Sequence, residues 1–110
     1  MPELTITGFW CKMNRTYIGL GSNLGNRESN LRQAVKAIGN SAGQVVTCSS
    51  VYETEAWGFP GSMFLNMVVV ADTPLLCKEL LEEIMVIEKR LGRTRKGGRY
   101  TSRTIDLDIL

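Results

Sequence analysis

The segment Arg103–Leu110, RTIDLDIL, alternates aliphatic and acidic residues. In an extended strand successive side chains point to opposite faces, so its aliphatic residues share one face while Asp106 and Asp108 share the other. Two neighbouring carboxylates repel one another unless their face is hydrated or a cation lies between them. A solvated strand face is the simpler interpretation of this pair taken alone. The segment predicts a strand with one face for a core and one face that suits a metal ion.

Working outward from this strand, hydrophobic periodicity predicts the element order β-α-β-β-α-β. The strands are expected at 16–20, 44–52, 63–71 and 103–110, and the helices run through Leu31, Val35 and Ile38 to Gly39 and from the Thr73–Pro74 pair to Leu91. The glycine-punctuated segment 21–25 reads as a turn between the first strand and the first helix.

This order predicts an α+β fold of the ferredoxin-like class. Because crossover connections are right-handed, both helices should pack on one face of an antiparallel-rich sheet. The other face then stays open. By the period of two, Asp106 and Asp108 lie on that open face. Phe64 and Asn66 share a face of their own strand, and we expect it to be the same open face.

Composition excludes several kinds of site. The chain has 110 residues, 44% hydrophobic and 22% charged, which is typical of one small globular domain. It has no histidine, so a histidine general base, a Ser-His triad and a histidine-ligated zinc are excluded. The cysteines at 11, 48 and 77 lack metal-type spacing, and we expect reduced thiols and a cytoplasmic location. No apolar run is long enough to span a membrane.

A basic segment precedes the acidic strand. Seven of the 13 Lys and Arg residues lie between Lys89 and Arg103, with no acid among them. Solvated charge is the simpler interpretation of this segment alone. Arginines beside two carboxylates on an open sheet face are nevertheless what magnesium-dependent phosphoryl transfer needs, because Mg²⁺ is held by few carboxylates plus phosphate oxygens and arginines neutralise the phosphate charge.

Four stretches then carry a family resemblance, namely GLGSNLGNRESNL, SSVYETEAWG, FLNMVVV and IEKRLGRTRKGGRYTSRTIDLDIL. In this order and spacing the chain resembles the 6-hydroxymethyl-7,8-dihydropterin pyrophosphokinase family (2-amino-4-hydroxy-6-hydroxymethyldihydropteridine diphosphokinase) from Thr16 to Leu110. The resemblance implies an ATP- and magnesium-dependent enzyme of folate biosynthesis. It would transfer pyrophosphate from ATP to the hydroxymethyl group of the dihydropterin and release AMP.

The resemblance also implies roles for individual residues. Two Mg²⁺ ions would be held by Asp106 and Asp108, which count as catalytic together with Arg93 and Arg103. ATP would be contacted by Glu88, Arg93, Arg95, Arg99, Tyr100 and Arg103. The pterin would be bound by Thr54, Trp57, Phe64 and Asn66, with Thr54 and Trp57 in the loop after the second strand. The implied partners are these small molecules, with no nucleic acid, no membrane and no obligate protein partner.

Two departures from the family pattern qualify these expectations. Tyr100-Thr101-Ser102 stands where the family often has tryptophan followed by Gly-Pro. The family's domain also continues beyond the acidic strand, with a second pterin-stacking aromatic and residues around the adenine. We therefore expect residues 15–110 to be the N-terminal part of a pyrophosphokinase domain, C-terminally truncated, and residues 1–14 to be a loosely attached leader.

Two other classes of protein remain as alternatives. A basic ferredoxin-like module could bind nucleic acid, although the aromatic pair typical of RNA-binding sheets is absent from the sequence. Another two-metal nucleotidyl transferase would also carry paired acids on a strand.

Overall fold

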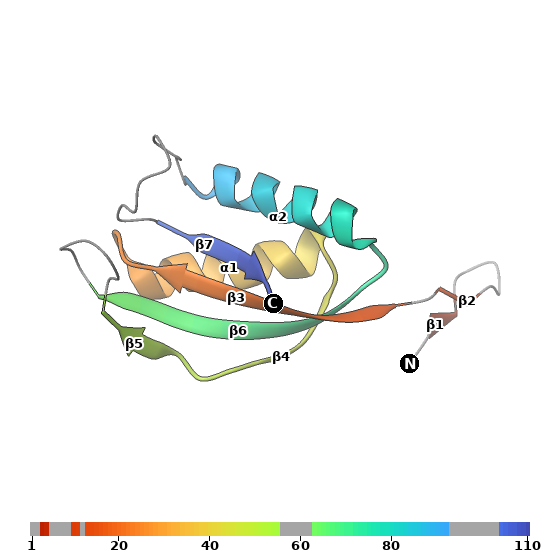
Figure 1. Cartoon of the computed structure of the whole chain (residues 1–110), viewed down its shortest axis with the longest axis horizontal. Coiled ribbons are helices and arrows are strands. Elements are labelled where there is room, and N and C mark those ends of the chain that lie inside the picture. Colours follow the sequence, from red (N-terminus) through yellow and green to blue (C-terminus); the bar gives the residue numbers. More distant parts are fainter. Residues whose placement is uncertain (1–2, 5–9, 12, 56–62, 93–103) are drawn as a thin grey trace.

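The computed structural model describes residues 3–4, 10–11, 13–55, 63–92 and 104–110 (Figure 1). Its strands are β1 (Glu3–Leu4), β2 (Trp10–Cys11), β3 (Asn14–Ser22), β4 (Gln44–Cys48), β5 (Tyr52–Thr54), β6 (Phe64–Thr73) and β7 (Asp106–Ile109). Its helices are α1 (Arg27–Ser41) and α2 (Cys77–Arg90). Strands β1 and β2 form a separate two-stranded antiparallel sheet.

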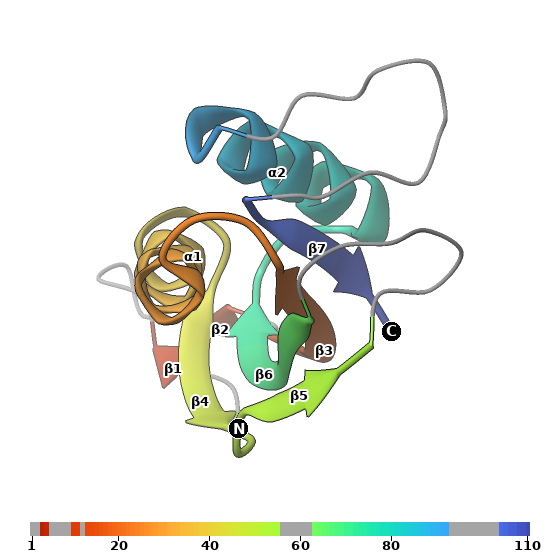
Figure 2. The same ribbon diagram turned by 90° about the vertical axis from the view of Figure 1, so that its left-hand side faces the viewer.

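The main sheet has the strand order β4-β6-β3-β7, and β5 pairs with the first part of β6. Every pairing in it is antiparallel. Helices α1 and α2 lie on the same side of this sheet, as Figure 2 shows, and the other side carries no helix among the described residues. The predicted ferredoxin-like α+β architecture is therefore confirmed.

The hydrophobic core lies between the sheet and the two helices. Its fully buried members include Ile18 on β3, Val69 on β6 and Ile84 on α2. Strand β6 alternates between half-buried and buried residues from Asn66 onward, as expected for a strand with one covered face. Burying each large aliphatic side chain contributes about 1.5–3 kcal/mol, so this one interface accounts for much of the stability of the fold.

The second predicted strand is divided in two. Strand β4 ends at Cys48 and β5 begins at Tyr52, with an irregular register between Val45 and Thr47. At the break, the backbone N–H of Ser49 donates to the carbonyl of Val68 at 2.8 Å, and the Ser49 hydroxyl accepts from the Val68 N–H at 2.8 Å. The Ser49 hydroxyl thus accepts the hydrogen bond that a backbone carbonyl would accept in a regular pair of strands. Serine side chains can interrupt the regular hydrogen-bond pattern of a sheet in this way.

The predicted start of the second helix was wrong. Thr73 is the last residue of β6, and its buried hydroxyl donates to the carbonyl of Ala42 at 2.5 Å and accepts from the Leu75 N–H at 3.1 Å. Residues 74–76 are not helical, so this hydroxyl closes a turn after β6 and does not cap α2. Helix α2 begins at Cys77, and the N–H of its N-cap residue Leu76 donates to the side chain of Glu79 at 2.8 Å.

Two smaller boundaries also differ from the prediction. Gly39 does not end α1, which continues to Ser41. Gly21 lies inside β3 rather than in a turn, whereas Gly25, with φ of +72°, is in the turn that follows. Among the described residues, no helix is long and apolar enough to cross a membrane.

Candidate functional site

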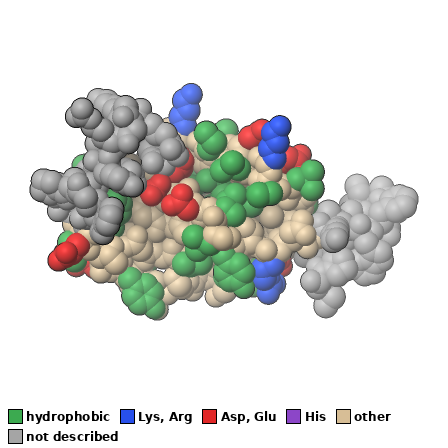
Figure 3. All heavy atoms as spheres, in the orientation of Figure 1, with side chains coloured by type: hydrophobic (Ala, Val, Ile, Leu, Met, Phe, Trp, Pro, Cys, Tyr) green, Lys and Arg blue, Asp and Glu red, His purple; other side chains and the backbone are tan. Residues whose placement is uncertain are grey.

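The two acids of β7 lie on the open face of the sheet. Ile105 and Leu107 are 0% and 4% exposed and belong to the core, while Asp106 is half-buried and Asp108 is exposed. This alternation is the one expected from the sequence. Acidic side chains are visible on the face of the molecule that Figure 3 shows.

A row of residues crosses the open face from β7 to β6. Asp106 is opposite Gly21 on β3, and Gly21 is opposite Asn66 on β6. Directly opposed residues in antiparallel strands share a face, so the carboxylate and the amide project from the same surface, with their backbones about 10 Å apart across two strand spacings. Gly19 is opposite Asp108 in the same way. Neither glycine places a side chain between the acids and β6.

The contribution of Gly21 was missed from the sequence because the residue was assigned to a turn. A Cβ atom at Gly21 would lie 3.2 Å from Oδ1 of Asn66 and 3.5 Å from Cδ1 of Phe64. The spacing Gly19-Leu-Gly21, with one buried leucine between two glycines, is the signal that could have identified a stretch of strand without side chains on its open face, where neighbouring groups can approach the backbone closely.

The residues expected to bind a pterin come together at one end of the sheet. Thr54 is opposite Phe64 in the β5–β6 pairing, and Asn66 donates from Nδ2 to the Thr54 hydroxyl at 2.6 Å. Thr54 is the last residue of β5 and not part of a loop, which corrects the sequence-based position. The result is an aromatic side chain, a hydroxyl and an amide on one face, the side from which Asp106 also projects.

Glu88 lies on α2 and is buried, with 4% of its surface exposed. Its Oε2 atom accepts a hydrogen bond of 2.8 Å from the backbone N–H of Leu107, the residue between the two acids. Leu110 donates to Tyr17 of β3, so by antiparallel alternation the N–H of Leu107 points away from β3, toward the outer edge of the sheet. The carboxylate of Glu88 therefore satisfies an edge donor of the acid-bearing strand.

The remaining expected site residues are Trp57, Arg93, Arg95, Arg99, Tyr100 and Arg103, and all of them lie outside the described residues. The described part of the candidate site thus consists of the β7 acids, Glu88, and the group on β5 and β6.

The β7 carboxylates fit magnesium better than a metal held wholly by protein. Within the described ranges there is no group of three or more His, Cys, Asp or Glu side chains that could hold an ion. Two carboxylates two residues apart on a strand are separated by about 7 Å along the chain. Mg²⁺ takes one or two carboxylates and completes its shell with phosphate oxygens and water. Asp106 and Asp108 provide that ligand set.

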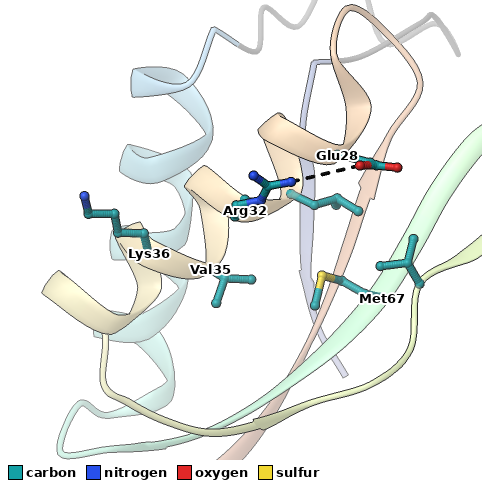
Figure 4. A pocket seen from close by; sticks show the side chains of 7 residues that line it. Glu28, Arg32, Val35, Lys36 and Met67 are labelled. Carbon is teal, nitrogen blue, oxygen red and sulfur yellow. Dashed lines mark ion pairs between the residues drawn. The ribbon is translucent and has the colours of Figure 1, made fainter.

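Two other features of the described surface lie apart from this group. A hollow of about 440 Å³ lies on the helix side of the sheet, lined by α1 residues together with Val51 and Met67 (Figure 4). At the far end of the open face, Arg15 forms two hydrogen bonds with Asp72, at 2.9 and 3.1 Å, and this contact lowers the pKa of the Asp72 carboxyl.

Comparison with known proteins gives a consistent result. The family model for 7,8-dihydro-6-hydroxymethylpterin-pyrophosphokinase matches residues 17–110. A 2-amino-4-hydroxy-6-hydroxymethyldihydropteridine pyrophosphokinase of Bacillus subtilis is 50% identical over 99 residues, covering 88% of this chain and 59% of the relative. Its counterpart in Porphyromonas gingivalis is 45% identical over 97 residues, covering 86% and 66%.

A longer protein also matches. The mitochondrial folate synthesis bifunctional protein of Pisum sativum is 46% identical over 94 residues, which is 84% of this chain and 18% of that protein. The chain spans 59% to 66% of the bacterial relatives from Bacillus subtilis and Porphyromonas gingivalis. With a family match over most of its length and close relatives of one name, the chain belongs to the 7,8-dihydro-6-hydroxymethylpterin-pyrophosphokinase family.

Proposed function

We propose that the protein transfers the terminal pyrophosphate of ATP to the hydroxymethyl group of 6-hydroxymethyl-7,8-dihydropterin, with release of AMP, in folate biosynthesis. The observation that carries this proposal is the row across the open face, with acids on β7, bare backbone at Gly21 and an aromatic–amide group on β6. This row suits the binding of two ligands side by side on one surface. Family membership supports the identification of these ligands as ATP and the dihydropterin.

The pterin half of the proposed site is built from Phe64, Asn66 and Thr54, with Trp57 as a further contact. A pterin is flat and has a donor–acceptor edge, so an aromatic face and a short amide suit it. The hydrogen bond of 2.6 Å to Thr54 fixes the amide of Asn66. Its Oδ1 atom, close to Gly21, is then oriented to accept from an amino group at the ring edge.

The phosphate half rests on Asp106 and Asp108, which we propose hold two Mg²⁺ ions. Such ions screen the phosphate charge that otherwise repels an attacking oxygen. Glu88 belongs to this half. Further contacts to ATP are proposed for the arginines at 93, 95, 99 and 103, because guanidinium groups bind phosphate oxygens in a bidentate manner. Tyr100 is proposed as an ATP contact on the family resemblance alone.

The reaction needs little covalent chemistry from the protein. The hydroxymethyl oxygen forms a bond to the β-phosphorus and loses its proton, and the bond from that phosphorus to the α–β bridging oxygen breaks, so AMP leaves. Holding the two substrates on one rigid sheet face supplies positioning, and the charged groups supply electrostatic stabilisation. A site of this kind works without histidine, which the chain lacks.

The proposed domain limits and location follow from the same interpretation. We assign residues 15–110 to the pyrophosphokinase domain and residues 1–14 to a leader. Cys48 and Cys77 are free thiols, which supports a reducing, cytoplasmic setting.

Product analysis of the complete reading frame tests the function. With ATP, Mg²⁺ and hydroxymethyldihydropterin, ³¹P NMR should show AMP and a pterin diphosphate ester in equal amounts. Formation of ADP, or of pyrophosphate with a nucleotidyl adduct, would instead indicate another transferase. A salt titration against single-stranded RNA addresses the nucleic-acid alternative, for which binding should weaken steeply with salt.

A further inference from the structure

The first turn of α1 is attached to the end of the sheet where the candidate site lies. Nη1 of Arg27 donates to Oε2 of Glu53 at 3.0 Å and to the backbone carbonyl of Met63 at 2.6 Å. Glu53 precedes Thr54 on β5, and Met63 precedes Phe64 on β6. One guanidinium nitrogen therefore joins the residues that stand immediately before both members of the Thr54–Phe64 pair.

This contact is made on the helix side of the sheet, whereas Thr54 and Phe64 project from the open face. Glu53 is opposite Leu65, a residue packed against the core, so its side chain projects to the helix side while Thr54 projects to the open face. Asn30, one turn further along α1, makes a similar connection, because its Nδ2 donates to the Ser22 hydroxyl at 3.1 Å and to the carbonyl of Leu24 at 2.8 Å. Residues three apart on a helix share a face, so the start of α1 ties several strand ends together.

Within the part of the chain that the structure describes, strand β5 makes few other contacts. It is three residues long, pairs with β6, and all three residues are exposed. A hollow of about 340 Å³ lies beside it, lined by Arg27, Glu53, Met63 and the turn 23–25. With an open hollow on its helix side, β5 is not fixed by core packing, and short strands of this kind have low local stability.

Exposure separates Arg27 from an ordinary surface arginine. Its side chain is 30% exposed, whereas that of Arg32 on the same helix is 80% exposed and lies 4.0 Å from Glu28 (Figure 4). Exposed ion pairs contribute little. Arg27 instead joins a carboxylate and a backbone carbonyl of two different strands, so its loss releases both at once.

We infer that Arg27 is a positioning residue for the pterin half of the site. By fixing Glu53 and Met63 from the helix side, it sets the separation of Thr54 and Phe64 on the open face. This inference rests on the proposed function for the identity of the ligand. It does not extend to the phosphate half, because β7 lies beyond β3 and is not part of this contact.

The test compares Arg27→Met with Arg32→Met in the product of the complete reading frame. Affinities for the pterin and for a magnesium complex of a non-hydrolysable ATP analogue are measured by calorimetry. Arg27→Met should weaken pterin binding about fivefold to tenfold, which is less than the loss of a direct charge-assisted contact because Arg27 acts on the pterin only through Glu53 and Met63, and it should change nucleotide affinity less than twofold. Arg32→Met should change neither. Wild-type pterin affinity in Arg27→Met, or equal losses for both ligands, would overturn the inference.

Two further variants separate positioning from general destabilisation. Arg27→Lys keeps the charge without the planar fork and should give an intermediate pterin affinity. In Arg27→Met combined with Glu53→Gln, the loss should be no larger than in Arg27→Met alone, because both changes remove the same contact. Additive losses would contradict a shared role.

A ligand-free measurement keeps the inference distinct from the proposed function. Amide hydrogen exchange at β5 should be faster in Arg27→Met than in wild type, and exchange at β7 should be unchanged. If wild type binds no pterin but hydrogen exchange at β5 is faster in Arg27→Met, the proposed ligand is wrong, and the inference that Arg27 positions β5 holds. If β5 does not respond, Arg27 does not position it.

Discussion

Asn66 has a neighbour on each side of its amide group. Its Nδ2 atom donates a hydrogen bond of 2.6 Å to the Thr54 hydroxyl. Its Oδ1 atom lies close to Gly21 of β3, the strand between β6 and the acid-bearing β7. The side chain is fixed before any ligand arrives, which lowers the entropic cost of recognising a ring edge. Of the described side chains, it is the one that tests the proposed pterin half separately from the proposed phosphate half.

We predict that Asn66→Ala weakens pterin binding about tenfold, the equivalent of one hydrogen bond of about 1–1.5 kcal/mol. Affinity for the magnesium–nucleotide complex should change less than twofold, because the acids are unaffected. Calorimetric titration with each ligand measures both values, and Asn40→Ala, near the exposed C-terminal end of α1, serves as the control. An equal loss of both affinities would show that Asn66 does not read the pterin.

At the residue scale, the positions of some site residues could be predicted from the sequence and the contacts of others could not. The faces of Asp106 and Asp108 follow from local alternation, which needs no knowledge of the rest of the chain. The contacts of Arg27 join residues 26 and 36 positions away, so they depend on how α1 packs and leave no local pattern. The role of Gly21 likewise depends on its neighbours across the sheet.

At the scale of elements, α2 and β7 are joined by a buried carboxylate. Glu88 accepts from the N–H of Leu107 at 2.8 Å, on the outer edge of a strand of four residues. Losing a buried acceptor leaves that N–H without its partner, at a cost of about 1–3 kcal/mol. The strand that presents Asp106 and Asp108 is thus held by β3 on one side and by Glu88 on the other.

We predict that Glu88→Met weakens binding of the magnesium–nucleotide complex several-fold and speeds hydrogen exchange at the Leu107 amide. Glu88→Gln keeps an acceptor oxygen at the same reach and should retain slow exchange there. Exchange measured by NMR on both variants distinguishes the hydrogen bond from the charge. Fast exchange in Glu88→Gln would mean that the carboxylate charge is what matters.

The strand β3 permits a second comparison at this scale. A Cβ at Gly21 would lie 3.2 Å from Asn66 Oδ1, whereas a Cβ at Gly19 would first meet the flexible end of Leu110 at 3.5 Å. We predict that Gly21→Ala weakens pterin binding about fivefold to tenfold, because the amide must move, while Gly19→Ala leaves it within about twofold of wild type. Pterin titrations of the two variants measure this difference. Equal pterin affinities in both would contradict the assigned role of Gly21.

The break between β4 and β5 shows what pattern reasoning could not give at the scale of elements. The segment 44–52 is rich in β-branched residues and was predicted as one strand. Its interruption depends on the paired contacts of Ser49 with Val68, which come from the neighbouring strand. Similarly, Thr73 has the residue type of a helix cap, but its hydroxyl bonds to Ala42 of a distant segment.

At the scale of the whole molecule, the chain presents its two proposed half-sites on one sheet but spans only 59% of its Bacillus subtilis relative. The family resemblance implies further pterin and adenine contacts in the part of the relatives that the chain does not span. The described surface therefore accounts for the proposed pterin and phosphate contacts, not for the whole of nucleotide binding.

We predict that the 110 residues alone bind pterin weakly and form no AMP from ATP and hydroxymethyldihydropterin. A chimera that adds the part of the Bacillus subtilis relative that this chain does not span should recover both properties. AMP formation is followed by chromatography of the nucleotides. Robust AMP release by the 110-residue chain would show that the described fold already contains the complete site.

The central claim is that Asp106 and Asp108 of β7 hold the Mg²⁺ ions through which ATP is bound. Calorimetry of magnesium-dependent ATP binding tests this claim most directly. Asp108→Ala is compared with Asp72→Ala, which removes the same charge at the far end of the open face, where the acid pairs with Arg15. With circular dichroism unchanged in both, Asp108→Ala should abolish magnesium-dependent binding and Asp72→Ala should retain it. Wild-type affinity in Asp108→Ala would contradict the metal assignment and the proposed mechanism.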